Sequence, residues 1–135
     1  MIVVCDTSVL VAAQVARAGV CAECVRTILA RYRLVVSDFI LSEFQRKLAG
    51  KLRFPESVAR HLRHELEAVS ERVTPIELPP DVCRDPNDIP ILATACAGGA
   101  SLLVSVDLDL LALGEFRDIL IRKPGQAFAV MADAR

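Results

Sequence analysis

The sequence predicts one α/β domain, with a central parallel sheet of four to five strands flanked by helices on both faces. Short apolar runs rich in β-branched residues alternate along the chain with segments that carry apolar residues at helical spacing. The length of 135 residues suits one domain with a core of its own. We therefore assign residues 1–135 to a single domain.

Four runs predict strands, because each is short, apolar and bounded by polar or turn-forming residues. These strands are expected at residues 1–5, 34–36, 102–106 and 119–121. Apolar residues at helical spacing predict helices between them, with Pro55 opening one helix and Gly98-Gly99 ending another. The expected helices cover residues 8–17, 21–31, 39–52, 55–69, 88–96 and 108–113. Pro124-Gly125 then leads into a last apolar segment.

Composition sets the broad class. Apolar residues make up 53% of the chain and aromatic residues 4%, which indicates an aliphatic core between layers and hints at a surface buried against a partner. The net charge of −1 does not by itself indicate nucleic-acid binding. Basic residues nevertheless gather in one stretch, either as a phosphate-binding face or as a solvated helix face. They are Arg46, Lys47, Lys51, Arg53, Arg60 and Arg63.

The cysteines favour a reducing compartment. Their number is odd, at five, and no signal peptide precedes the first strand, so a cytoplasmic location is expected. Cys21 and Cys24 have C-x-x-C spacing, but no second ligand pair follows, so we interpret them as packing residues rather than zinc ligands. No apolar stretch reaches the roughly 20 residues that a membrane helix needs, so no membrane association is expected.

Acidic residues recur where the predicted strands end. The carboxyl ends of parallel strands meet at one edge of a sheet, and sites of α/β proteins form outside that edge. One acidic residue directly follows the first strand, another lies one turn into the helix after the second, and two follow the third. Two more open the helix that leads into the third strand. In chain order they are Asp6, Glu43, Asp85, Asp88, Asp107 and Asp109.

Each of these residues also has a structural explanation. Asp6 or Thr7, and Asp88, could cap the helices that follow them, and Asp107 and Asp109 could be ordinary turn residues. Separate caps and turns do not explain why the carboxylates converge. Several carboxylates in one pocket would repel one another, and a divalent cation removes that conflict. Oxygen ligands of this kind suit Mg²⁺ or Mn²⁺.

Five motifs in order resemble the PIN-domain family. A hydrophobic strand leads to D-T-S at 6–8, S-x-x-x-x-x-E covers 37–43, D-I-P-I-L-A-T-A covers 88–95, and S-V-D covers 105–107. The closing I-R-K-P-G-Q-A-F is similar to the last strand and tail of that family. Within the family, the chain is most similar to the VapC-like toxin components of bacterial toxin–antitoxin pairs. Serine at 105, where threonine is common, and Val106, in place of a polar or small residue, depart from the pattern.

The resemblance implies a Mg²⁺- or Mn²⁺-dependent endoribonuclease. It implies catalytic and metal-binding roles for Asp6, Glu43, Asp88 and Asp107, with Asp109 as a further ligand and Asp85 competing with Asp88. The side chains expected to contact substrate are Thr7, Ser8, Ser37, Ser105, Arg46 and Lys47.

The expected partners are an RNA substrate, a cognate antitoxin and a second copy of the chain in a homodimer. The alternative is a catalytically inactive PIN-like scaffold that binds RNA or a protein partner. P-loop and Rossmann proteins need glycine patterns that are absent here. A haloacid-dehalogenase-like phosphatase needs D-x-D after the first strand, where this chain has Ser8.

Overall fold

The computed structural model describes residues 1–134 and contains a six-stranded sheet in the order β3-β2-β1-β4-β6-β5. Neighbouring strands from β3 to β6 run parallel, and β5 pairs with β6 in the antiparallel direction. The predicted α/β class is therefore confirmed, with one antiparallel strand at the edge. The strands are β1 (Ile2–Cys5), β2 (Arg33–Val36), β3 (Glu71–Arg72), β4 (Leu102–Val104), β5 (Glu115–Phe116) and β6 (Ile119–Arg122).

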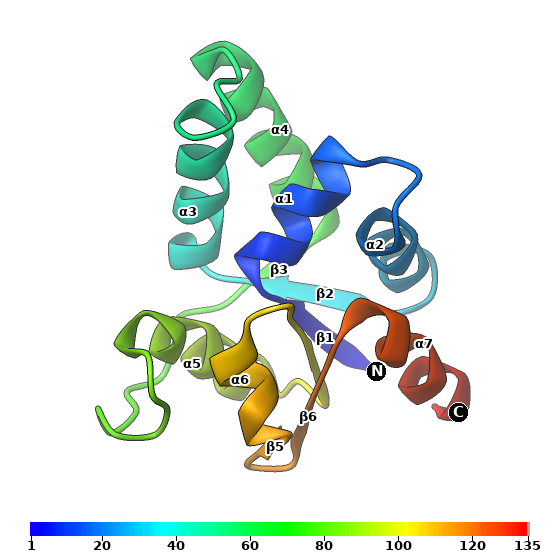
Figure 1. The fold of residues 1–135 in the computed structure, drawn as a ribbon, viewed down its shortest axis with the longest axis vertical. Coiled ribbons are helices and arrows are strands. Elements are labelled where there is room, and N and C mark those ends of the chain that lie inside the picture. The colour runs from blue at the N-terminus through cyan, green and yellow to red at the C-terminus, as the bar shows by residue number, and fades with distance from the viewer. Residues whose placement is uncertain (135) are drawn as a thin grey trace.

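Helices cover both faces of the sheet (Figure 1). In this view α1 and α2 lie on one side of the strands, with α3 and α4 beyond them, while α5 and α6 lie on the other side. The helix α5 contacts β1 and β2, and α2 contacts β2 and α7. The helices are α1 (Thr7–Val15), α2 (Val20–Arg31), α3 (Asp38–Ala49), α4 (Glu56–Val69), α5 (Ile89–Gly98), α6 (Leu108–Leu113) and α7 (Pro124–Asp133), with a 3-10 turn η1 (Pro86–Asp88) before α5.

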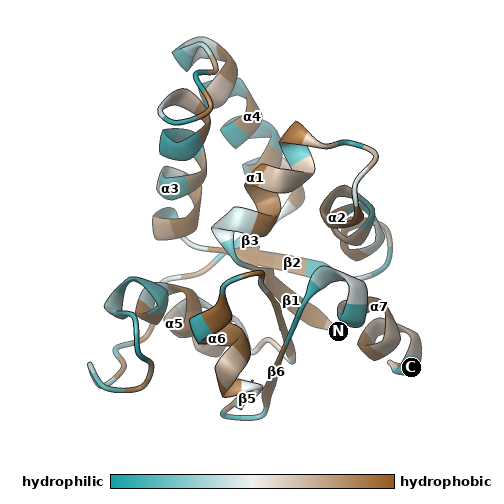
Figure 2. Ribbon diagram, viewed as in Figure 1, coloured by the Kyte–Doolittle hydropathy of each residue, from teal (hydrophilic) through white to brown (hydrophobic). Residues whose placement is uncertain are grey.

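The core is aliphatic and lies on both sides of the central strands. Val3, Val4 and Cys5 of β1 are completely buried, as expected for a strand covered on both faces. Figure 2 shows hydrophobic residues along β1, β2 and α5, with hydrophilic residues along the outer turns of α3 and α4. The approach of α5 to β2 is close, because a Cβ on Gly98 would lie 2.6 Å from a methyl carbon of Val35.

Four strands and six helices lie where the sequence predicts them, within a few residues at their ends. The two strands not predicted, β3 and β5, have two residues each, which is too short for any periodic pattern. The last apolar segment forms the helix α7. Within residues 1–134, no single helix is long and apolar enough to span a membrane; α1 and α2 meet that criterion only together, and they are bent by 108° at the break between them.

The order of the strands creates a switch point beside β1. From β1 the chain first passes to β2 on one side, and it later returns to place β4 on the other side. The register pairs Val4 of β1 with Val35 of β2 and with Leu103 of β4. A crevice outside the carboxyl ends of β1 and β4 is the usual place for a ligand in such a sheet. The residues that follow these two strands are Asp6 and the segment 105–107.

Candidate metal centre

A polar pocket of about 300 Å³ lies at this carboxyl edge, where β1, β4, α3 and α5 come together. It gathers acidic residues from four separate parts of the chain, which is the convergence that the sequence predicts. The acidic residues that line it are Asp6, Glu43, Asp85, Asp88 and Asp107. The remaining lining residues are Ser8, Arg46, Lys47, Asn87 and Ile91.

Asp6 is held by its neighbours from β4 rather than by the helix that follows it. Its backbone N–H donates to the carbonyl oxygen of Val104 at 2.8 Å, which fixes the end of β1 against the end of β4. The side chain is 6% exposed and makes no capping hydrogen bond to α1. Instead, the hydroxyl of Ser105 donates to Oδ2 of Asp6 at 2.9 Å. The capping interpretation of this side chain is therefore not what the structure shows.

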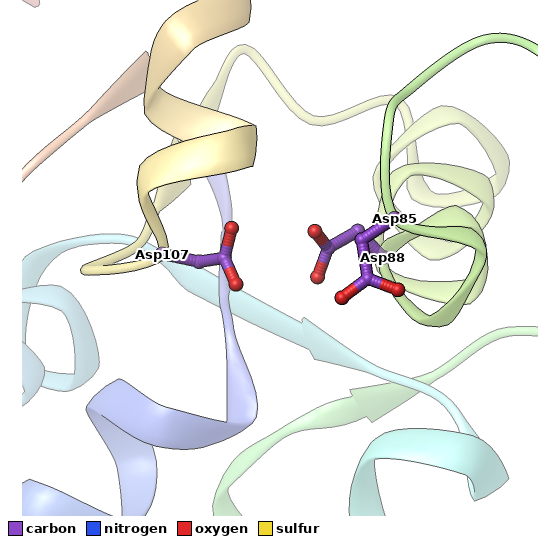
Figure 3. Close-up of side chains that lie close together, drawn as sticks. All are labelled: Asp85, Asp88 and Asp107. Atoms are coloured by element: carbon purple, nitrogen blue, oxygen red, sulfur yellow. The ribbon is translucent and has the colours of Figure 1, made fainter.

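Asp107 caps α6 and also faces the pocket. Its Oδ1 accepts hydrogen bonds from the backbone N–H groups of Asp109 at 2.8 Å and Leu110 at 3.1 Å. Its own N–H donates to the Ser105 hydroxyl at 2.9 Å. Ser105 thus links Asp6 to Asp107. Because the cap fixes the rotamer, the carboxylate lies across the pocket from Asp85 and Asp88, as Figure 3 shows.

Asp85 and Asp88 stand at the start of η1 and α5. Oδ1 of Asp85 accepts from the N–H of Asn87 at 3.0 Å, and the N–H of Asp88 donates to the Asp85 carbonyl at 3.0 Å. Asp88 is only 7% exposed, and its Oδ2 is a buried oxygen with no hydrogen-bond partner among the described residues. A buried carboxylate oxygen without a donor is costly, so a ligand that satisfies it is expected at this point.

The carboxylates fit a divalent cation. One oxygen each of Asp85, Asp88 and Asp107 lie within 4.8 Å of one another, and these oxygens face a common space (Figure 3). The structure therefore brings to the pocket both Asp88, which the family resemblance favours as a ligand, and its competitor Asp85. An all-carboxylate set favours a hard cation such as Mg²⁺ or Mn²⁺ over a softer metal.

The electrostatics of the pocket agree with that fit. Burial, followed by the nearby carboxylates of Asp107, Asp6 and Asp85, raises the pKa of Asp88 to about 7. Burial also raises the pKa of Asp6, although the hydrogen bond from Ser105 opposes this shift. A cation among these oxygens would favour the ionised forms and reverse both shifts.

Basic side chains of α3 border the acidic pocket. The side chain of Glu43 is 17% exposed and lies 3.5 Å from a guanidinium nitrogen of Arg46 and 3.9 Å from Nζ of Lys47. The charge of Lys47 also lowers the pKa of Asp6. These residues follow one another at i, i+3 and i+4, so one face of α3 presents both signs of charge to the pocket.

The predicted hydroxyl residues lie at different distances from the pocket. Ser8 lines it, whereas Thr7 and Ser37 are completely buried and lie outside its lining. Ser37 caps α3, accepting from the N–H of Ile40 at 3.5 Å, and it also accepts a hydrogen bond of 2.7 Å from the Thr94 hydroxyl. Oγ1 of Thr7 is buried without a hydrogen-bond partner in the described chain. Substrate contact by Thr7 and Ser37 stays a prediction.

Two further positions complete the comparison with the sequence. Asp109 does not line the pocket, and its side chain, 35% exposed, lies 4.0 Å from Arg84. Asn87 and Ile91 do line it, although neither was a candidate from the sequence. Asn87 could have been found from its place between Asp85 and Asp88. Nothing in the sequence marked Ile91, which is a buried residue of α5.

Comparison with known proteins agrees with the fold. A chain in a crystal structure of VapBC2 from Rickettsia felis, bound to a DNA fragment from their promoter, is similar with a TM-score of 0.64 and 14% identity. The alignment covers 91% of this chain and 98% of that one, and at this identity it concerns the fold alone. No curated protein matches the sequence.

The family model described as PIN domain matches residues 2–109. Since that match includes Asp6, Glu43, Asp88 and Asp107, and most of the chain, this protein belongs to the PIN-domain family.

Proposed function

We propose that this chain is a Mg²⁺- or Mn²⁺-dependent endoribonuclease and the toxin component of a toxin–antitoxin pair. PIN domains are generally nucleases, and the chain has the acidic cluster that such an activity needs. The proposal rests on the convergence of one oxygen each of Asp85, Asp88 and Asp107 within 4.8 Å, together with a buried Oδ2 of Asp88 that has no hydrogen-bond partner in the described chain. A pocket with this arrangement is suited to hold a cation and, beside it, a phosphate.

The residues have separate roles in this proposal. Asp85, Asp88 and Asp107 would hold the metal, which when bound supplies a hydroxide from water at neutral pH and neutralises charge on the phosphate. Asp6, fixed by Ser105, adds negative charge at the floor of the pocket. The Glu43 carboxylate lines the same pocket, where it would accept a proton from the attacking water.

RNA is proposed as the substrate from the family resemblance. The geometry supports a phosphodiester in general, because Arg46 and Lys47 line the same pocket as the carboxylates. Such side chains position a backbone but do not read a base sequence. Cleavage within a strand, rather than from its ends, follows from the resemblance in the same way.

The proposed partners are a cognate antitoxin and a second copy of this chain. The likeness to a chain of a VapBC2 structure supports the antitoxin. Large apolar side chains at the surface, such as Val20, Val69 and Leu108, support burial against another protein. All five cysteines are free, which agrees with a reducing cytoplasm. Light scattering on the purified chain measures the dimer directly.

The first experiment is a calorimetric titration of Mn²⁺ and Mg²⁺ into the wild type and the Asp6→Asn variant, each then incubated with labelled RNA. We expect saturable metal binding and internal cleavage by the wild type, and at least about 100-fold slower cleavage by Asp6→Asn. The matched control is Asp133→Asn, which makes the same change on an exposed residue of α7. Circular dichroism and urea unfolding confirm that each variant is folded.

Four outcomes separate the possibilities. Metal-dependent cleavage that Asp6→Asn loses and Asp133→Asn keeps supports the nuclease. Metal binding with no cleavage of any RNA favours the inactive scaffold that binds RNA or protein. Wild-type cleavage rates in Asp6→Asn would contradict the assignment of the site, and no metal binding at all would mean that the carboxylates serve only the fold.

A further inference from the structure

We propose that a second pocket, beside the metal centre, binds a nucleotide that flanks the cleaved phosphate. We call it the flanking groove and define it by Ser8, Val11, Val15, Lys47, Lys51 and Leu52. Its volume is about 390 Å³, within the range of about 300–1,000 Å³ for small-ligand sites. This inference rests on the proposed nuclease function, because it names where that site holds the neighbouring nucleotide.

The flanking groove is continuous with the acidic pocket. Ser8 and Lys47 line both, so a strand that leaves the metal centre past these two residues enters the groove directly. Ser8 follows Thr7 in the first turn of α1, and Lys47 lies in the last turn of α3. The helices α1 and α3 contact each other, which sets the spacing between the two pockets.

Apolar side chains form the floor of the flanking groove. Val11 and Val15 are one helical turn apart on α1, so they share a face of that helix. Val15 is 53% exposed and Leu52 is 37% exposed. Three aliphatic side chains around one concave surface give a base or ribose an apolar contact. The groove residues include no aromatic ring, so binding through this contact is weaker than ring stacking and tolerant of base identity.

The charged residues of the flanking groove are both basic, namely Lys47 and Lys51. The backbone of the turn that carries Lys51 is fixed after α3, because the N–H of Leu52 donates to the Lys47 carbonyl at 3.3 Å and that of Phe54 to the Leu48 carbonyl at 2.8 Å. The acidic pocket and the groove thus offer a cation site followed by two ammonium groups. A strand whose regularly spaced phosphates meet the ammonium groups and whose base faces meet the apolar floor matches this arrangement. With RNA as the substrate of the proposed function, we assign the occupant as single-stranded RNA.

The test measures RNA binding independently of cleavage. Fluorescence anisotropy follows a labelled single-stranded RNA, in Mn²⁺, on the full chain in the Asp6→Asn background. We expect Lys51→Ala to weaken binding about 3- to 10-fold and to reduce the slope of log K against log salt by about 0.7, the value for one lost phosphate contact on a single strand. Val15→Asp adds a negative charge on an exposed position and should weaken binding at least about tenfold.

Two control variants make the same kinds of charge change outside the flanking groove. Arg31→Ala removes one exposed positive charge at the end of α2, next to the amino end of β2 and so at the opposite edge of the sheet. Ile76→Asp adds a negative charge at a side chain that is 40% exposed and outside the flanking groove. Both should change RNA affinity less than about twofold. Crosslinking of 4-thiouridine RNA should label peptides containing residues 8–15 or 47–52.

Cleavage is measured in parallel on proteins that carry Lys51→Ala or Val15→Asp but keep Asp6. These rates distinguish failure of the flanking groove from failure of the proposed nuclease function. RNA binding that depends on Lys51 and Val15, without any cleavage, supports the flanking groove and overturns the nuclease. Metal-dependent cleavage with RNA affinity unchanged by Lys51→Ala and Val15→Asp overturns the groove and leaves the nuclease standing. Crosslinks confined to other peptides, or a protein partner that protects this groove while RNA does not, also overturn the assignment.

Discussion

The two sides of the acidic pocket hold their carboxylates in different ways. On the β1–β4 side, Asp6 accepts a hydrogen bond from Ser105, and Asp107 accepts two from the start of α6. On the α5 side, Asp88 has a buried oxygen with no partner in the described chain and a pKa raised to about 7. Both sides are acidic and each has one buried carboxylate, Asp6 on the first and Asp88 on the second, so the difference lies in the donors that the protein supplies.

This difference shows which part of the pocket the protein completes by itself. The β1–β4 side is organised by backbone N–H groups and one hydroxyl, so its geometry is set by the fold. The α5 side leaves an anion uncompensated, which costs stability unless a cation binds. We infer that the first side orients the site and that the second contributes most to the affinity for metal.

The largest expected effect is on cleavage, when either side loses a charge. Asp88→Asn and Asp107→Asn should each slow metal-dependent RNA cleavage at least about 100-fold, because each removes the negative charge of a carboxylate with an oxygen in the cluster. Single-turnover cleavage rates measure this, with Asp133→Asn as the unaffected control. A wild-type rate in Asp88→Asn would show that the α5 side does not take part in the chemistry.

A smaller effect, about tenfold on cleavage, is expected for Ser105→Ala. The substitution removes the donor that lowers the pKa of Asp6 and the acceptor for the N–H of Asp107. The pKa of Asp6 should then rise further, so the acidic limb of the cleavage pH profile should move to higher pH. Ser105→Thr keeps the hydroxyl and should restore both rate and profile. An equal loss of rate at every pH would indicate a purely structural role.

Stability without metal should respond in opposite directions on the two sides. In EDTA at pH 5.5, where Asp88 with its pKa of about 7 is largely protonated and repels Asp107 little, Asp107→Ala should lower the free energy of unfolding by about 1 kcal/mol, since it removes the cap of α6. In EDTA at pH 8, where Asp88 is largely ionised, Asp88→Asn should raise it by up to about 1 kcal/mol, since it removes a repelled carboxylate. Urea unfolding measures both. Destabilisation by Asp88→Asn in EDTA would contradict the contrast between the two sides.

The pH dependence of stability in EDTA follows from the raised pKa of Asp88. Unfolded aspartate titrates near 3.9, whereas folded Asp88 titrates at about 7. Between these values the folded protein holds a proton that the unfolded chain has lost, so stability falls as pH rises from about 4 to about 7. After allowance for solvent screening the fall is about 1 kcal/mol. Asp88→Asn should remove most of it, and Mn²⁺ should stabilise the wild type more at pH 8 than at pH 5.5.

The smallest effect is expected at Asp109, the additional metal ligand suggested by the family resemblance. Its carboxylate lies outside the pocket lining and 4.0 Å from the exposed Arg84. Asp109→Asn keeps its backbone N–H, which donates to Asp107, so cleavage should change less than about threefold. A loss as large as that of Asp107→Asn would mean that Asp109 turns inward when metal binds.

The sequence by itself predicted the sheet and the edge at which the site lies. Strands covered on both faces need continuous apolar runs, and residues 2–5 and 102–104 are such runs, each leading into acidic residues. The four acidic candidates from separate motifs all line one pocket. The short strands β3 and β5 could not be predicted, because two residues contain no period and their pairing depends on neighbours distant in sequence.

Only the tertiary structure decided what each acidic side chain does. From its position in the sequence, Asp107 can be either a helix cap or a metal ligand. In the structure its Oδ1 caps α6, and one oxygen of its carboxylate also lies near Asp88. This second contact exists because the turn between β4 and α6 lies opposite the start of α5. Ser37 has the residue type of a substrate contact but is buried against Thr94. Local sequence sets helix starts and strand ends. Burial and hydrogen-bond partners depend on contacts between distant parts of the chain. Ser105 and Asp6 are 99 residues apart, and they meet because β4 lies beside β1 in the sheet.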